Sequence, residues 1–450
     1  MSHPSFFIKT FGCQMNSRDS EIMAQTLSEK GYVESMDMET SDLVILNTCS
    51  IRAKAEQKVM SLLGMLRNVR KRRPSMRICV AGCVAEQEGA RLMERMPHVD
   101  LVLGTQNIYQ LTTLLDNLDQ AGRIATGLSP DYEIPAYIPV IPTFSDEQDR
   151  PFRKFLTIMQ GCNNFCSYCV VPHTRGREIS RKVKDIVAEA QALVDAGIKE
   201  ITLLGQNVNS FGQTNSVTED GSPYPFSLLL REISQLNGLK RLRFTTSNPK
   251  DLSDDLMRCF SEIDILCHHF HLPVQSGSNA VLKQMNRKYT RELYLDRVAG
   301  LRSYCSDISL STDMIVGFPG ETDEDFEQTM DLLETVRFHG SFSFKYSDRP
   351  GTRSSAFDNK VEEDLKTRRL QRFQKRQDEI SLEHNQSFID QTVEIMIEKI
   401  SDEGLAGRTG SNHIVHVNDS NLPPCHPGDL LQVKIDHGGP HSLRGKLPAE

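Results

Sequence analysis

Short apolar runs and helix-like segments alternate along the first 125 residues. Apolar runs at 6–11, 43–46 and 76–81 each lead into a cysteine-containing turn, and a helix is predicted from 20 to 30, where a glycine ends it. Short apolar runs without alternation are typical of parallel strands that are covered on both faces. We therefore predict an α/β domain with parallel strands over residues 1–125.

A second alternation of strands and helices occupies the middle of the chain. Six apolar segments are strand candidates with helical stretches between them: 155–160, 201–205, 242–247, 268–274, 309–316 and 341–346. Six βα units predict a parallel barrel, and six strands are fewer than the eight of a closed (β/α)₈ barrel. We therefore predict an incomplete (β/α)₆ barrel over residues 151–380, with a charged basic helix at 361–380 as its last part.

The composition changes on both sides of this central domain. Residues 126–150 are rich in proline and acidic side chains, which predicts a linker. Residues 381–450 contain short strand candidates at 391–397, 413–417 and 429–435, with glycines between them. Several short strands separated by glycine turns predict a small all-β barrel at the end of the chain.

The overall composition is that of an ordinary globular protein. The chain has 450 residues, of which 38% are hydrophobic and 25% charged, and its net charge is −8; this length predicts more than one domain. No apolar run approaches the roughly 18 residues that cross a bilayer, and no basic segment followed by an apolar one opens the sequence. We therefore expect a cytoplasmic protein, in which the 11 cysteines stay reduced and metal ligation is favoured over disulfides.

Three cysteines in one short loop are the strongest chemical signal. Cys162, Cys166 and Cys169, here called the Cys162 triad, follow the first predicted barrel strand with the spacing C-x₃-C-x₂-C. A [4Fe-4S] cluster held by three thiolates keeps one iron open for a small molecule. Zinc is the alternative, with His173 as a fourth ligand. Buried free thiols are a second alternative, which the polar, glycine-containing surroundings disfavour.

Cys13, Cys49 and Cys83, here called the Cys13 triad, each follow a predicted strand. They are separated by 36 and 34 residues. The carboxyl ends of neighbouring parallel strands meet at one edge of a sheet, so the three thiols are expected to converge on a second three-ligand site. Chance alignment of strand-end cysteines is the alternative at so long a spacing.

Longer motifs around these cysteines resemble a known family. They are Phe11-Gly12-Cys13-Gln14-Met15-Asn16, Asn47-Thr48-Cys49-Ser50-Ile51-Arg52, Ala81-Gly82-Cys83, Gln160-Gly161-Cys162-Asn163-Asn164-Phe165-Cys166, Leu204-Gly205-Gln206-Asn207, Leu272-Pro273-Val274-Gln275-Ser276-Gly277 and Gly317-Phe318-Pro319-Gly320-Glu321. Through them nearly the whole chain resembles the methylthiotransferases of the radical S-adenosylmethionine superfamily. The residues after Cys13 and Cys49 are similar to the branch that modifies tRNA rather than a ribosomal protein. The C-terminal part resembles the RNA-associated barrel called TRAM, through Gly407-Arg408-Thr409 and Ser442-Leu443-Arg444-Gly445.

The resemblance implies a fold and a chemistry. It implies a Rossmann-like α/β domain, a partial (β/α)₆ radical-SAM barrel and a small antiparallel β-barrel. It also implies an auxiliary [4Fe-4S] cluster on the Cys13 triad and a second [4Fe-4S] cluster on the Cys162 triad, where S-adenosylmethionine binds and is cleaved to a radical. The implied reaction places a methylthio group on carbon 2 of N6-isopentenyladenosine in tRNA and uses two molecules of S-adenosylmethionine.

Contacts and partners follow from the same resemblance. S-adenosylmethionine is expected near Gly205, Gln206, Gln275, Ser276 and Asp313, which lie at or after barrel strands. Ordinary loop structure is the alternative for each of these residues. The implied partners are the anticodon stem-loop of tRNA and an electron donor; no membrane is involved, and a monomer is expected.

Charge gives mixed evidence on an RNA partner. Basic residues gather at 67–73, 175–184 and 366–376, as phosphate binding requires, although a solvated helix face is the commoner reason for such groups. Residues 381–450 hold ten acidic and five basic residues, which suits a basic protein partner better. Modification of a ribosomal protein is therefore one alternative, and a non-catalytic RNA-binding protein with structural zinc is another.

Overall fold

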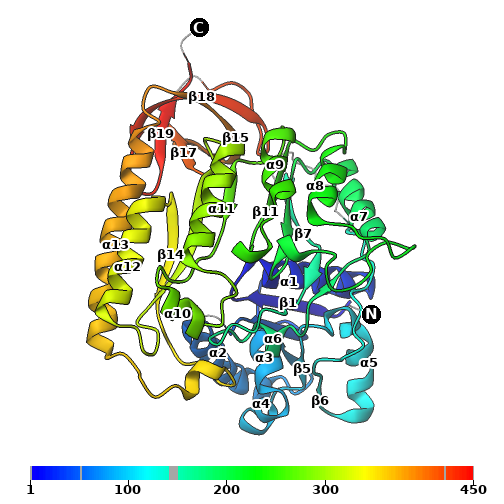
Figure 1. Cartoon of the computed structure of the whole chain (residues 1–450). Coiled ribbons are helices and arrows are strands. Elements are labelled where there is room, and N and C mark those ends of the chain that lie inside the picture. The colour runs from blue at the N-terminus through cyan, green and yellow to red at the C-terminus, as the bar shows by residue number, and fades with distance from the viewer. Residues whose placement is uncertain (1–2, 51–52, 141–149, 420–421, 449–450) are drawn as a thin grey trace.

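Three parts of the chain follow one another along the long direction of the molecule (Figure 1). The computed structural model describes residues 3–50, 53–140, 150–419 and 422–448. The N-terminal part, drawn in blue and cyan, lies against one end of the central barrel, and the C-terminal barrel, drawn in red, lies against the other. Ile51, Arg52 and the linker segment 141–149 lie outside the described residues.

The N-terminal part is built on a six-stranded sheet in the order β2-β1-β3-β4-β5-β6, and all its pairs are parallel. Its strands are β1 (Ser5–Thr10), β2 (Val33–Glu34), β3 (Leu43–Thr48), β4 (Arg77–Gly82), β5 (Leu101–Leu103) and β6 (Ile124–Ala125). Every residue of β3 is buried, as its continuous apolar run predicts. The predicted parallel α/β fold is confirmed, whereas β2, β5 and β6 are too short to give a periodic signal.

Helices cover both faces of this sheet. They are α1 (Gln14–Glu29), α2 (Ala53–Arg72), α3 (Cys83–Glu88), α4 (Ala90–Arg95) and α5 (Leu111–Ala121), with a 3₁₀ turn η1 (Ile108–Gln110) before α5. Leu63 of α2 and Leu92 of α4 belong to the core on one face, and Met23 of α1 and Leu111 of α5 to the core on the other. The sheet is thus buried between two helical layers, which leaves its carboxyl edge to carry chemistry.

Helix α1 begins at Gln14, earlier than the predicted start at Ser20. The prediction was wrong because the first turns of α1 are polar and yet buried, with Asn16, Arg18 and Asp19 all at most 4% exposed. These side chains face polar partners instead of an apolar core. The hydrophobic period that marks a helix is therefore absent from this segment of the sequence.

The central part is an open parallel barrel, as predicted. Its six strands are β7 (Arg153–Thr157), β10 (Glu200–Leu204), β11 (Arg241–Phe244), β12 (His269–His271), β13 (Ser309–Val316) and β14 (Gly340–Lys345). They form the parallel sheets β11-β10-β7 and β12-β13-β14, which a single bridge between Leu242 and Leu266 connects. Among the described strands, β7 and β14 each pair with one neighbour in this barrel, so the barrel is open between them.

Helices form the outer layer of the barrel and share its largest core. They are α7 (Val183–Asp195), α8 (Phe226–Ser234), α9 (Asp254–Glu262), α10 (Asn279–Gln284), α11 (Arg291–Tyr304), α12 (Asp323–Val336) and α13 (Glu363–Gln386), with 3₁₀ turns η3 (Val208–Ser210), η4 (Pro249–Asp251) and η5 (Arg353–Ala356). The short helix α6 (Val171–Thr174) lies instead against α3 of the N-terminal part. The ribbon of β8 (Met159–Gln160) and β9 (Ile179–Ser180) follows β7 and frames the loop that contains the Cys162 triad.

The C-terminal part is a closed barrel in the order β15-β16-β17-β19-β18. Its strands are β15 (Thr392–Ser401), β16 (Gly404–Thr409), β17 (Ile414–Val417), β18 (Leu430–Gly438) and β19 (Leu443–Lys446). The expected fully antiparallel pairing needs one correction, because β17 and β19 run parallel. A closed ring with an odd number of strands cannot alternate direction throughout, so one parallel pair is unavoidable.

This small barrel covers the amino ends of the central barrel strands. Arg243 of β11 donates to the carbonyl oxygen of Thr409 at 2.8 Å, and Lys199, just before β10, pairs with Asp429 at 2.8 Å. The lumen of the central barrel is therefore closed at the amino end, while the N-terminal part faces its carboxyl end. Among the described residues, no helix is both long and apolar enough to span a membrane.

Candidate active site

The Cys13 triad lies at the carboxyl edge of the N-terminal sheet. Cys49 and Cys83 directly follow β3 and β4, which pair at Thr48 and Gly82, and Cys13 follows the neighbouring strand β1. The turn before Cys13 is tight: Gly12 has φ +126°, and a Cβ there would lie 2.2 Å from the Cβ of Cys49. Only glycine allows this approach, which brings the Cys13 and Cys49 loops into contact.

Contacts within this triad perturb its thiols. A hydrogen bond with the Cys49 thiol lowers the pKa of Cys13 to about 6, burial opposes this shift, and the positive charge of Arg175 adds to it. Burial raises the pKa of the Cys83 thiol, and Arg175 offsets part of the rise. Cys13 thus contacts Cys49, and both Cys13 and Cys83 lie near the guanidinium of Arg175, so the three cysteines predicted to converge share one site.

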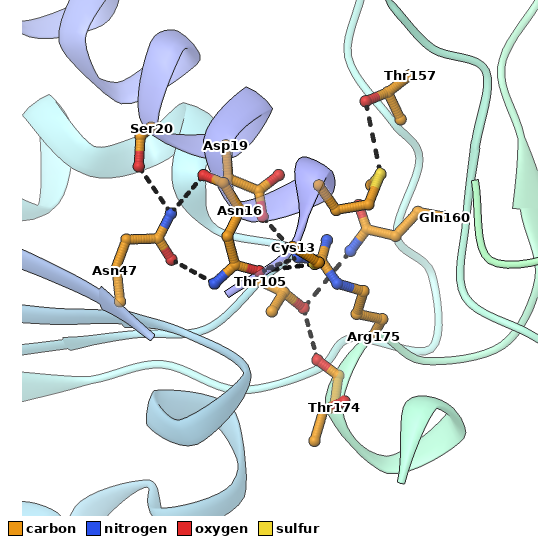
Figure 2. A network of polar contacts seen from close by, with 12 residues as sticks. Cys13, Asn16, Asp19, Ser20, Asn47, Thr105, Thr157, Gln160, Thr174 and Arg175 are labelled. Atoms are coloured by element: carbon orange, nitrogen blue, oxygen red, sulfur yellow. Dashed lines mark hydrogen bonds and ion pairs between the residues drawn. The ribbon is translucent and has the colours of Figure 1, made fainter. Parts of the chain in front are cut away.

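Asn16 makes hydrogen bonds to several groups around the Cys13 triad. Its Nδ2 donates to the carbonyl oxygen of Thr48 at 2.8 Å and to Oδ1 of Asn47 at 3.2 Å. Its Oδ1 lies 3.5 Å from the Cys13 sulfur and accepts from Nη2 of Arg175 at 3.1 Å. One buried amide thus connects two cysteine loops with a residue of the central barrel (Figure 2).

The Cys162 triad lies in the loop after β8, at the carboxyl end of the first barrel strand. Gly161 has φ +80°, and a Cβ there would lie 2.0 Å from the carbonyl oxygen of Arg177, so this turn also requires glycine. The backbone N–H and Nδ2 of Asn164 lie 3.5 and 3.4 Å from the Cys162 sulfur, and Nη1 of Arg287 lies 3.4 Å from the Cys166 sulfur. Donors to ligating sulfurs are a standard means of tuning an iron–sulfur centre.

The number of thiols in each triad favours a cluster over a single zinc ion. Structural zinc sites almost always have four protein ligands, and each triad offers three thiols. In a [4Fe-4S] cluster each thiolate ligates a different iron, so three thiolates leave one iron open. Among the described residues, the group of three metal-binding side chains with all ligand atoms within 4.8 Å is His268, Cys305 and Asp307, outside both triads.

Arg175 connects the two halves of the site. It follows α6 in the segment after the Cys162 triad, and its side chain enters the N-terminal part, where Nη2 donates to Oδ2 of Asp19 at 2.7 Å. The side chains of Arg175 and Asp19 are 3% and 5% exposed. Next to this pair, Oγ1 of Thr105 donates to the carbonyl oxygen of Thr174 at 2.7 Å (Figure 2). These contacts hold the carboxyl edge of the sheet against the mouth of the barrel.

The residues proposed to contact S-adenosylmethionine lie at two places on the barrel rim. Oε1 of Gln206 accepts from the backbone N–H of Gly161 at 2.5 Å, and a Cβ on Gly205 would meet Met159, so both adjoin the cysteine loop. Gln275, with φ +76°, donates its N–H to the carbonyl oxygen of Asp313 at 2.9 Å. Their cofactor contacts stay predictions.

Ser276 differs from the other four residues. It is fully buried, its hydroxyl lies 3.4 Å from Oγ1 of Thr329 on α12, and it accepts from the N–H of Ser278 at 3.2 Å. The structure therefore gives this hydroxyl partners within the protein, on the outer side of the barrel. Asp313, in contrast, is partly exposed and lies 3.5 Å from Nε2 of His271.

Several arginines that the sequence suggested for phosphate binding are internal. Arg175, Arg181 and Arg369 are buried and pair with Asp19, Glu189 and Glu321 respectively. For these three residues the RNA-contact prediction was wrong, because charge in a sequence does not reveal burial. Arg177 is exposed and stacks on Phe165, with its Cζ 4.2 Å from the ring centroid.

Comparison with known proteins places this geometry in a family. Residues 5–104 match the "Uncharacterized protein family UPF0004", and residues 156–333 match the "Radical SAM superfamily". The tRNA-2-methylthio-N(6)-dimethylallyladenosine synthase of Desulfotalea psychrophila is 61% identical over 451 residues, which cover 100% of both chains. The chain belongs to the tRNA-2-methylthio-N(6)-dimethylallyladenosine synthase family.

A second member of the tRNA-2-methylthio-N(6)-dimethylallyladenosine synthase family, from Syntrophus aciditrophicus, is 45% identical over 99% of this chain and 94% of its own. Among solved structures, the radical S-adenosylmethionine methyltransferase TsrM from Kitasatospora setae has a TM-score of 0.57 at 16% identity, covering 79% of this chain and 77% of that chain. The cobalamin-dependent S-adenosylmethionine radical enzyme OxsB has a TM-score of 0.51 at 13% identity, covering 79% and 55%. At these identities both structures show the fold alone.

Proposed function

We propose that this protein transfers a methylthio group to carbon 2 of N6-dimethylallyladenosine in tRNA. The names of its relatives support the substrate. The observation that carries the proposal is Arg175, a barrel residue buried among the thiols of the Cys13 triad. A reaction that joins a sulfur to a carbon radical needs the two centres at one cavity, and this contact brings the two cysteine loops together.

The donor set supports two [4Fe-4S] clusters, one on Cys13, Cys49 and Cys83 and one on Cys162, Cys166 and Cys169. Each set offers three thiols, one fewer than the four ligands of a structural zinc site. Nη1 of Arg175 is buried and has no hydrogen-bond partner among the described residues. A buried unpaired donor is costly, and sulfur atoms of a bound cluster would satisfy it.

The bound groups would supply the radical and the sulfur, and the protein supplies placement. Arg175, held by Asp19 and Asn16, would balance negative charge at the Cys13 triad. Arg287 and Asn164 would donate to ligands of the Cys162 triad. The small barrel covers the amino end of the lumen and would limit the access of water to a reactive radical from that side.

Replacing Arg175 by methionine is expected to destabilise the protein. Breaking this buried ion pair leaves the buried carboxyl of Asp19 without its partner, and such a loss typically lowers the free energy of unfolding by about 3–5 kcal/mol. Denaturant unfolding of the cluster-free protein measures this change. Arg177→Met is the matched control, because Arg177 is exposed and its loss should cost about 0.5 kcal/mol or less. Equal free energies of unfolding for the two variants would contradict the role given to Arg175.

The function itself is tested on RNA. The protein is purified and reconstituted anaerobically, then incubated with S-adenosylmethionine, a reductant and prenylated tRNA, and the nucleosides are analysed by mass spectrometry. The expected product is the methylthio derivative of the prenylated adenosine, made by a brown protein with about eight irons per chain. A colourless protein containing zinc would overturn the proposal. A parallel incubation with ribosomes that methylthiolated only protein would do so as well.

The finer features of the reaction belong to the same proposal. We place the substrate adenosine in the anticodon stem-loop of tRNA, and the reaction in the cytoplasm, where tRNA is found. The protein would act as a monomer and receive electrons from a separate donor. Size-exclusion chromatography with and without tRNA tests the monomer.

A further inference from the structure

Two phenylalanines lie exposed on the last strand of the barrel. Phe342 is 57% exposed and Phe344 45%, and Phe342 is the most exposed phenylalanine in the described part of the chain. They occupy β14, which within the described strands pairs only with β13 and forms one border of the opening of the barrel. Neighbouring large apolar side chains that are exposed to solvent indicate a binding surface rather than a core.

Both rings face the lumen. Successive side chains of a strand point to opposite faces. Ser343 accepts a hydrogen bond from Nε2 of Gln374 on α13 at 3.2 Å, and Lys345 contacts the same helix. Helix α13 belongs to the outer layer (Figure 1). Phe342 and Phe344, on the opposite face, therefore point inward.

The ring of Phe344 has an apolar neighbour on β13, whereas the ring of Phe342 has polar neighbours. Phe344 is in register with Ile315 of β13, and Phe342 is in register with Asp313. The ring of His271 meets that of Phe342 edge-on, with centroids 5.8 Å apart. The lumen thus offers two aromatic faces beside a small number of polar groups, the composition typical of a site for a planar, partly apolar ligand.

Resting on the function proposed above, we propose that Phe342 and Phe344 bind the dimethylallyl-adenine of the substrate, with Phe342 against the dimethylallyl group. Carbon 2 must face the cysteine triads, which lie at the carboxyl ends of the strands. In adenine the bonds at carbon 2 and at N6 diverge, so the N6 substituent is directed down the lumen. Phe342 lies two residues deeper along β14 than Phe344, so its ring supplies the apolar contact at the depth that the N6 substituent would reach.

The assignment makes Phe342 a specificity residue, which two RNAs can test. The reconstituted protein and its Phe342→Ala variant are titrated with an anticodon stem-loop RNA that carries the dimethylallyl group and with the same RNA without it. We expect Phe342→Ala to weaken binding of the prenylated RNA roughly tenfold or more, as loss of an apolar contact of this size does, and to leave the unprenylated RNA within about twofold of the parent. Phe342→Leu, which stays apolar, should recover part of the preference. Met36→Ala is the control, because Met36 is another exposed apolar side chain, 94% exposed. This variant should bind the prenylated and the unprenylated RNA as the parent does.

Each result decides between the alternatives. A preference for prenylated RNA that persists in Phe342→Ala overturns the inference, as does an equal loss for both RNAs, which would indicate stacking on some other base. Loss of S-adenosylmethionine cleavage without RNA in Phe342→Ala would place Phe342 at the cofactor and would also overturn the inference. If the parent protein methylthiolates no RNA, the proposed function fails and the inference fails with it; if the parent is active and the preference is unmoved, only the inference fails.

Discussion

Replacing Cys166 by alanine is expected to abolish cleavage of S-adenosylmethionine. Cys166 is one of only three thiols in the loop after β8, and its sulfur lies 3.4 Å from Nη1 of Arg287. Two thiolates leave two irons without a protein ligand, so about four of the roughly eight irons per chain should be lost. Release of 5′-deoxyadenosine under anaerobic reducing conditions, together with iron and sulfide content, measures both effects.

The matched control is Cys425→Ala. Cys425 lies in the C-terminal part, packs against the core of the small barrel and belongs to neither triad. Its removal should leave the iron content and the rate of cleavage at the parent values. If Cys166→Ala still released 5′-deoxyadenosine at the parent rate, S-adenosylmethionine would have to bind elsewhere, and the assignment of the Cys162 triad would be lost.

The convergence of the Cys13 triad was predictable because parallel strands impose it. A buried parallel strand has a recognisable apolar run, and neighbouring parallel strands end at one edge. Cys13, Cys49 and Cys83 follow strands that are adjacent in the order β1-β3-β4. The incomplete central barrel was predictable for a similar reason, since six apolar segments alternate with helices along the sequence.

The partners of the triad were not predictable, because they are polar residues whose burial the sequence conceals. Asn16 and Arg175 resemble surface residues in composition, and Arg175 sits in a basic run that suggested RNA. Their sequence signals are indirect: Asn16 ends the motif around Cys13, three residues after that cysteine, and Arg175 follows Cys169 by six residues. Burial is decided by packing between two distant parts of the chain, so periodicity within either part cannot report it.

The prediction of short strands in the C-terminal barrel was incomplete for a different physical reason. The glycines at 404 and 407 were interpreted as turn residues, yet both lie in β16. A Cβ at Gly407 would lie 2.6 Å from the carbonyl oxygen of Met396 on β15, so glycine is needed there for close strand approach. Within a strand, glycine often marks a tight bend or the close approach of another backbone.

Replacing Cys49 by alanine is expected to separate the two half-reactions. Cys49 is 1% exposed and lies against Cys13 at the edge of the N-terminal sheet, in a different part of the chain from the Cys162 triad. Its loss should remove about four irons while leaving the other cluster in place. The variant should therefore release 5′-deoxyadenosine and yet transfer no methylthio group to prenylated tRNA. Parallel assays of 5′-deoxyadenosine and of the modified nucleoside measure the two activities in one sample.

The volume of the side chain is controlled with Cys49→Ser, because alanine leaves a small cavity beside a crowded glycine. Serine is close to cysteine in size but is a poor ligand for iron, so both variants should lose sulfur transfer if ligation is the cause. Recovery of transfer in the serine variant alone would indicate a packing role for Cys49. Normal transfer in both variants would remove Cys49 from the sulfur-carrying centre, and the Cys13 triad would then not hold the auxiliary cluster.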